Sequence, residues 1–157
     1  MDMEKITKDF KGISQFIGFL AVLQILNLVG AFETIMAMDV SVLGAMDYTA
    51  LGISTNTILT IVKVMTLMPY ALSIVALSYL CIKGLREAND PSPAKFHLIL
   101  AVICAVCYTC GAVDMLITLF SNSTDLLLKI LEVVISAFTA VLLFYYFSYA
   151  KKIRTKE

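Results

Sequence analysis

The sequence of residues 96–120 is FHLILAVICAVCYTCGAVDMLITLF. It contains one acidic residue, Asp114, and no lysine or arginine. A helix needs about 20 mostly apolar residues to cross the hydrocarbon core of a bilayer, where its backbone polar groups are satisfied within the helix. A soluble protein would interrupt so long a run with polar residues that face water. Residues 96–120 therefore predict a membrane-spanning helix.

The composition of the whole chain indicates the same class. Of its 157 residues, 60% are hydrophobic and 15% are charged, whereas soluble domains are usually about 45–50% apolar and about 25% charged. The lysines and arginines border the apolar stretches and form no basic face with interleaved aromatic residues, so we expect no nucleic-acid partner. The chain is predicted to be an integral membrane protein whose immediate partner is the lipid bilayer.

Three more apolar stretches predict further spans. They cover about residues 13–36, 57–83 and 126–149. The first is longer than the apolar region of about 7–15 residues in a secretory signal, so we expect it to be retained as a helix. Pro69 lies in the middle of the second span, where it removes a backbone hydrogen bond and predicts a kink. Ser92, which precedes the span at 96–120, is a predicted N-cap.

The other segments are short. Residues 1–12 and 150–157 are predicted to be an N-terminal segment and a basic tail on either side of one membrane domain, residues 13–149. The polar turn at 121–125 is so short that the third and fourth spans must be antiparallel neighbours. Residues 38–56 are open to two interpretations, a short helix along the membrane interface or an extension of the first span.

The lysines and arginines give the expected orientation. Ten of them flank the spans on one side: Lys5, Lys8, Lys11, Lys83, Arg86, Lys95, Lys151, Lys152, Arg154 and Lys156. The two connections on the other side, 38–56 and 121–125, have none. Because loops rich in lysine and arginine stay in the cytoplasm, both termini are expected there. The predicted fold is an all-α, four-span bundle with up-down connectivity.

Ionisable residues inside the spans form a candidate site. Lys63, Asp114 and Glu132 each lie roughly 9–10 Å below the outer end of their helix, at about 1.5 Å rise per residue. Lys129 is three residues before Glu132, a spacing that allows the two to pair. Other polar residues share helical faces and predict a partly polar interior. These are Gln24, Asn27, Thr66, Tyr70, Ser136 and Thr139.

Two interpretations of this charged layer stay open. Charges are costly in hydrocarbon, so they usually face the interior of a bundle and pair with one another. The layer is then a structural ion-pair network that fixes how the helices pack. Alternatively, it is a site for an ion, a proton or a polar ligand that enters from the outside.

Redox or metal chemistry is not expected. Cys104, Cys107 and Cys110 are spaced as two C-x-x-C pairs, but a reactive thiolate is usually accessible and often at a helix N-terminus. These cysteines lie well inside a span, where cysteine behaves as a small hydrophobic residue. A metal site needs more ligands, and motifs such as H-E-x-x-H and G-x-S-x-G are missing. We therefore expect no cofactor, no metal and no enzymatic activity.

Aromatic residues and the single histidine suggest interfacial positions. Tyr145, Tyr146 and Tyr149 lie near the predicted exit of the fourth span and resemble the aromatic belt of membrane proteins. His97 lies at the start of the third span. We expect these side chains to lie at the membrane interface.

Two stretches resemble a bacterial family of small four-helix inner-membrane proteins catalogued as a domain of unknown function. Residues 12–17, Gly-Ile-Ser-Gln-Phe-Ile, are similar to its G-I-G-G-W-L-like start, with Phe16 in place of tryptophan. Residues 146–154, Tyr-Phe-Ser-Tyr-Ala-Lys-Lys-Ile-Arg, are similar to its Y-F-x-x-S-K-R-V-K end. The resemblance implies a multi-pass protein of the bacterial inner membrane and brings no activity with it.

Three functions are compatible with these features. The first is an accessory or scaffold protein that binds another membrane protein, or itself, through its helices. The second is a subunit of an oligomeric channel or transporter that uses the charged layer, because four helices alone can hardly enclose a path. The third is a membrane enzyme that acts on a thiol or a lipid.

Overall fold

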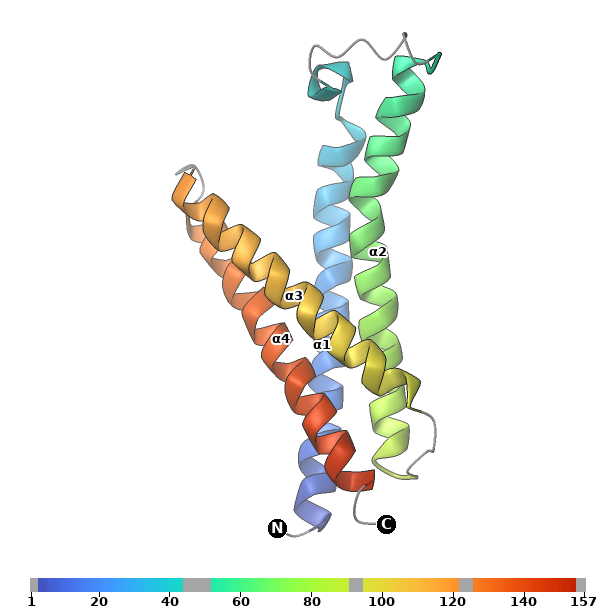
Figure 1. The fold of residues 1–157 in the computed structure, drawn as a ribbon, viewed down its shortest axis with the longest axis vertical. Coiled ribbons are helices and arrows are strands. Elements are labelled where there is room, and N and C mark those ends of the chain that lie inside the picture. Colours follow the sequence, from blue (N-terminus) through green and yellow to red (C-terminus); the bar gives the residue numbers. More distant parts are fainter. Residues whose placement is uncertain (1–2, 44–51, 91–94, 122–125, 155–157) are drawn as a thin grey trace. The chain divides into compact units, whose positions relative to one another are not determined.

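A computed structural model describes residues 3–43, 52–90, 95–121 and 126–154. Every element in these ranges is helical (Figure 1). The elements are α1 (Met3–Met36), the short 3-10 helix η1 (Val40–Leu43), α2 (Thr55–Glu87), α3 (Phe96–Ser121) and α4 (Leu126–Arg154). Four of them are long and apolar enough to cross a membrane. The predicted all-helical class with four apolar helices is thus confirmed.

The helices extend beyond the predicted spans. α1 begins at Met3, and α2 begins at Thr55 and ends at Glu87. A helix does not have to end where the hydrocarbon ends, because its backbone hydrogen bonds form equally well in water. Ser54 caps the start of α2, since its hydroxyl accepts a hydrogen bond from the backbone N–H of Thr57 at 3.2 Å. α2 continues through Pro69.

The described residues form two compact units. Unit 1 comprises Met1–Leu20 and Ala76–Glu157, and unit 2 comprises Ala21–Val75. Unit 1 therefore holds the first part of α1, the last part of α2, and all of α3 and α4. Unit 2 holds the remaining parts of α1 and α2 together with η1.

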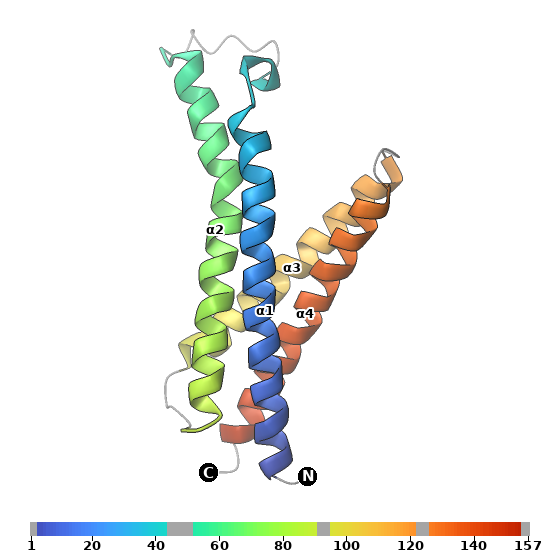
Figure 2. The same ribbon diagram turned by 180° about the vertical axis from the view of Figure 1, so that it is seen from behind.

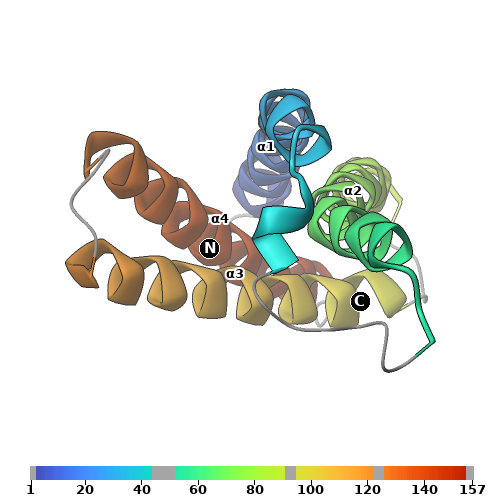
Figure 3. The same ribbon diagram turned by 90° about the horizontal axis from the view of Figure 1, so that it is seen from above.

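In unit 1, consecutive helices run in opposite directions. α3 and α4 lie side by side in all three views (Figures 1–3). Phe10 of α1 packs on Tyr146 of α4 with ring centroids 5.0 Å apart, and Tyr79 of α2 packs on Phe96 of α3 at 5.9 Å. The start of α1, the end of α2, the start of α3 and the end of α4 therefore meet at one end of the unit. Figure 2 shows the first and last helices reaching this end.

Unit 2 is an antiparallel pair formed by α1 and α2. The ammonium of Lys63 on α2 donates a hydrogen bond of 2.7 Å to the carbonyl of Met36, the last residue of α1. A cation is favourable there because the last carbonyls of a helix are unpaired and carry partial negative charge. The hydroxyl and the backbone N–H of Ser41 both donate hydrogen bonds to the carboxylate of Asp39. These bonds, the hydroxyl's above all, hold the pKa of that carboxyl below its usual range. Asp39 thereby secures the start of η1.

Part of the connection at 38–56 is now defined. It contains η1, a short helix separate from α1, while residues 44–51 lie outside the described part of the chain. The predicted cap at Ser92 and the turn at 122–125 also lie outside the described residues.

Candidate functional site

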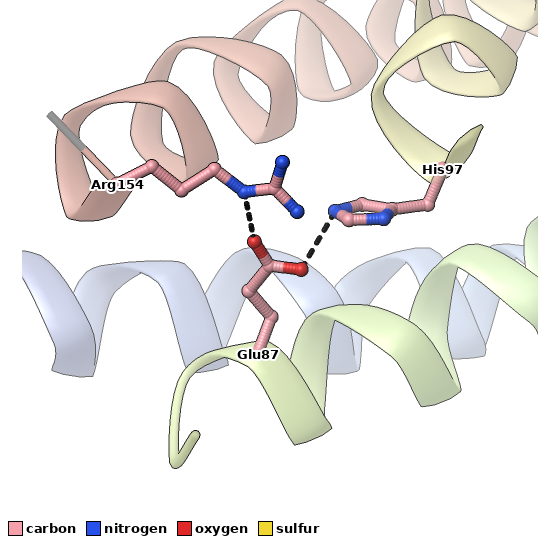
Figure 4. Close-up of polar contacts among 3 residues, drawn as sticks. All are labelled: Glu87, His97 and Arg154. Carbon is pink, nitrogen blue, oxygen red and sulfur yellow. Dashed lines mark hydrogen bonds and ion pairs between the residues drawn. The ribbon is translucent and has the colours of Figure 1, made fainter. Parts of the chain in front are cut away.

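Three ionisable side chains meet in unit 1, each from the end of a different helix (Figure 4). Glu87 is the last residue of α2, His97 is the second residue of α3 and Arg154 is the last residue of α4. The guanidinium of Arg154 donates through Nε to Oε1 of Glu87, and Nε2 of His97 lies 2.9 Å from Oε2 of the same carboxylate. We call these three residues the Glu87 cluster.

The cluster is buried. The side chains of Glu87 and His97 are each 1% exposed, and that of Arg154 is 15% exposed. An acidic residue at the C-terminus of a helix is unfavourable, because it adds negative charge to a negative dipole end. Burial increases that cost. Glu87 is tolerated in this position because Arg154 supplies a positive charge next to it.

The helices approach closely beside the cluster at Gly84. A Cβ at this position would collide with Oγ of Ser14 and would lie 2.6 Å from Cε2 of Tyr146. The Ser14 hydroxyl is itself buried and donates to the carbonyl of Phe10 at 2.9 Å. The rings of Tyr146 and His97 are perpendicular, with a centroid distance of 6.1 Å. All four helices of unit 1 thus contribute to the surroundings of the cluster.

Some polar atoms of this region lack an aligned hydrogen bond. Oε2 of Glu87, Nε2 of His97 and the hydroxyl of Tyr146 are buried without a hydrogen-bond partner among the described residues. His97 therefore contacts Glu87 at 2.9 Å with angles that do not suit a hydrogen bond. The arrangement joins three helix ends through one carboxylate.

No metal site is found among the residues that the structure describes. No group of three or more His, Cys, Asp or Glu side chains there is arranged to hold a metal ion. Cys107 and Cys110 are exposed on α3, and Cys81 and Cys104 are half-buried, all four as free thiols. Cys81 packs closely against Gly18, where an added Cβ would lie 2.7 Å from its sulfur.

The predicted charged layer is divided between the two units. Lys63 belongs to unit 2, whereas Asp114, Lys129 and Glu132 belong to unit 1. Lys63 is half-buried and bonded to the end of α1, Lys129 is half-buried, and the two carboxylates are exposed. The structure thus gives the position of each residue within its own unit. That the four residues form one layer stays a prediction.

The predicted polar interior shows a range of exposure. Thr139 is buried and donates to the carbonyl of Ile135 at 2.7 Å, and half-buried Thr66 donates to that of Val62 at 2.8 Å. Such bonds within a helix let a hydroxyl face apolar surroundings. The remaining members are Gln24, Tyr70 and Ser136, which are half-buried, and Asn27, which is exposed.

Sequence reasoning did not single out Glu87 or Arg154, and it expected His97 and Tyr146 at the interface. Both of the latter are buried, at 1% and 0% exposure. A signal for Glu87 was present in the helical spacing. Leu77, Leu80, Gly84 and Glu87 are the buried residues of α2, and their steps of three and four residues place them on one face. The predicted span ends at about residue 83, before Glu87, and so does not include the whole of that face.

Comparison of the chain with protein-family models, curated proteins and solved structures finds no match.

Proposed function

We propose that this chain is a multi-pass protein of the bacterial inner membrane that acts as an accessory or scaffold protein through its helices. It binds another membrane protein or a second copy of itself. The observation that supports this proposal is the apolar outer surface of the helices. Large side chains such as Val29, Val75 and Ile117 are 63%, 68% and 62% exposed. In a bilayer, such surfaces contact lipid or other helices.

The distribution of charge supports an orientation with both termini in the cytoplasm. The described members of the ten flanking lysines and arginines lie at the start of α1, the end of α2, the start of α3 and the end of α4. Those are the helix ends that meet in unit 1. Basic residues are retained on the cytoplasmic side during insertion, so we infer that the Glu87 cluster lies at the cytoplasmic end.

The Glu87 cluster favours a structural role over a catalytic one. Its carboxylate contacts Arg154 through one oxygen and His97 through the other, and the two contacts join α2, α3 and α4. A buried charge pair of this kind is attested as a device that specifies how elements pack. We infer that the cluster holds the cytoplasmic end together while the apolar faces of the helices bind partners.

Native mass spectrometry on protein gently extracted from its own membrane tests this function. We expect a defined homo-oligomer or a complex with a second protein. A monomer that carries no protein partner at any detergent concentration would contradict the proposal.

Reconstitution distinguishes the channel alternative. Liposomes that contain the purified protein should stay tight to ions under the accessory interpretation. Ion flux that is present with the wild-type protein and lost in Asp114→Asn and Glu132→Gln would instead favour a channel or transporter subunit.

A further inference from the structure

The feature that extends this proposal is a shallow groove on unit 2, between α1 and α2. Its volume is about 420 Å³. The residues that line it are Leu28, Val29, Phe32, Glu33, Leu67 and Ala71. Glu33 is the one charged residue among them. The groove is thus an apolar surface that carries a single carboxylate.

The spacing of the lining residues suits a third helix. Leu28 and Phe32 are four residues apart on α1, as are Val29 and Glu33, and Leu67 and Ala71 are four residues apart on α2. Rows of side chains at this spacing form the ridges and grooves by which helices pack. Ala71 is small and exposed, and small residues let the backbone of another membrane helix approach closely.

The charges of unit 2 specify what that helix should carry. Residues 21–75 contain three acidic residues, Glu33, Asp39 and Asp47, and one basic residue, Lys63. One positive minus three negative charges gives a net charge of −2. The ammonium of Lys63 is already bonded to the carbonyl of Met36. A carboxylate in an apolar membrane environment is costly unless a cation accompanies it, so the complementary partner is basic.

From these observations we propose that the groove binds a transmembrane helix of a partner protein, and that Glu33 pairs with a lysine or arginine near one end of that helix. This inference rests on the proposed accessory function and names the chemistry of the partner. Glu33 lies three residues before the end of α1, which is roughly 5 Å along the helix axis. The partner's basic residue should lie at a similar depth, about one turn inside its own outer end.

The test uses synthetic leucine–alanine transmembrane helices as probes. One carries a single lysine one turn from its outer end, and its twin carries leucine there. Binding of each labelled helix to the full-length protein in proteoliposomes is measured by energy transfer. We expect the wild-type protein to bind the lysine helix about tenfold more tightly, a difference typical of one polar contact between membrane helices.

Two variants examine the groove and two serve as matched controls. Glu33→Gln should remove the preference for lysine, and Ala71→Leu should weaken binding of both helices because it fills the groove. Asp90→Asn removes an exposed carboxylate outside the groove, and Ala137→Leu enlarges an exposed alanine on α4. Both controls should bind as the wild type does. Thermal unfolding of all four variants establishes that each is folded.

The possible outcomes are distinct. Equal binding of the two probe helices by the wild type, or a lysine preference that survives in Glu33→Gln, would overturn the inference. So would a phospholipid that copurifies with the wild type and is lost from Ala71→Leu, since the occupant would then be lipid. If native mass spectrometry nevertheless shows a bound protein, the accessory function stands and only its assignment to this groove is wrong.

Discussion

At the level of single residues, the Glu87 cluster holds a carboxylate in a position where negative charge is costly. Glu87 is buried at the C-terminal end of a helix, where a negative charge is disfavoured. Its charge is accepted because the guanidinium of Arg154 donates to one of its oxygens. Removal of one partner from a buried ion pair leaves the other charge buried without compensation, which destabilises more than the loss of both.

Replacement of Arg154 alone should therefore destabilise the protein more than replacement of both residues. We expect Arg154→Met to lower the free energy of unfolding by about 3 kcal/mol, because it leaves the buried Glu87 carboxylate without its guanidinium. Glu87→Gln should lower it less, because Arg154 is 15% exposed. The double variant should recover most of that loss. Reversible denaturation in detergent micelles measures all three. A double variant whose loss equals the sum of the single losses would show that the two residues are not coupled.

Two variants of Tyr146 separate the contribution of its ring to the free energy of unfolding from that of its hydroxyl. The side chain is fully buried, and its hydroxyl has no hydrogen-bond partner among the described residues. Tyr146→Phe should then leave the free energy of unfolding unchanged or raise it, because it removes a buried polar group that has no partner among the described residues. Tyr146→Ala should lower it by about 3–5 kcal/mol, because it leaves a cavity beside Phe10 and His97. A large loss in Tyr146→Phe would mean that the hydroxyl is bonded.

At the scale of helices, the close approach at Gly84 determines how α1, α2 and α4 pack in unit 1. No other residue type leaves room there for both Ser14 and Tyr146. Close contacts of this kind are typical of membrane helices, whose association depends on van der Waals packing. The packing of the helix ends therefore depends on the absence of one methyl group.

A pair of glycine variants tests this packing. Gly84→Ala should lower the free energy of unfolding by about 1–3 kcal/mol, as overpacking does. Gly111→Ala is the matched control on α3, where an added Cβ meets nothing within 4 Å. It should be neutral or stabilising by up to about 1 kcal/mol, since alanine favours a helix more than glycine does. Equal effects of the two substitutions in thermal unfolding would contradict the close approach.

The sequence predicts where the helices lie in the chain, but it predicts less well which side chains of different helices contact one another. Long apolar stretches predict helices because a chain in hydrocarbon must satisfy its backbone polar groups internally. The predicted second span ends at about residue 83, whereas α2 ends at Glu87. Lysine and arginine mark the membrane surface but do not end a helix, so Glu87 falls outside the predicted span. Its contact with Arg154 joins residues far apart in the chain, and no local pattern predicts such a contact.

The polar residues illustrate the same limit. Helical phase correctly groups residues of one helix on one face, but burial also depends on which helix covers that face. Thr139 is buried and Asn27 is exposed, although both were predicted to line a polar interior. The face of a helix on which a residue lies can be derived from one sequence. The order of the helices around a bundle can be derived only from contacts between segments that are far apart in the chain.

At the scale of the whole molecule, the account depends on one claim, that the chain crosses the bilayer an even number of times with both termini in the cytoplasm. The claim combines four apolar helices with lysines and arginines gathered at one set of helix ends. The most direct measurement is a pair of reporter fusions after Glu157. We predict that a reporter active only in the cytoplasm is active there and that a reporter active only in the periplasm is silent. Robust activity of the periplasmic reporter, with a silent cytoplasmic one, would contradict the account.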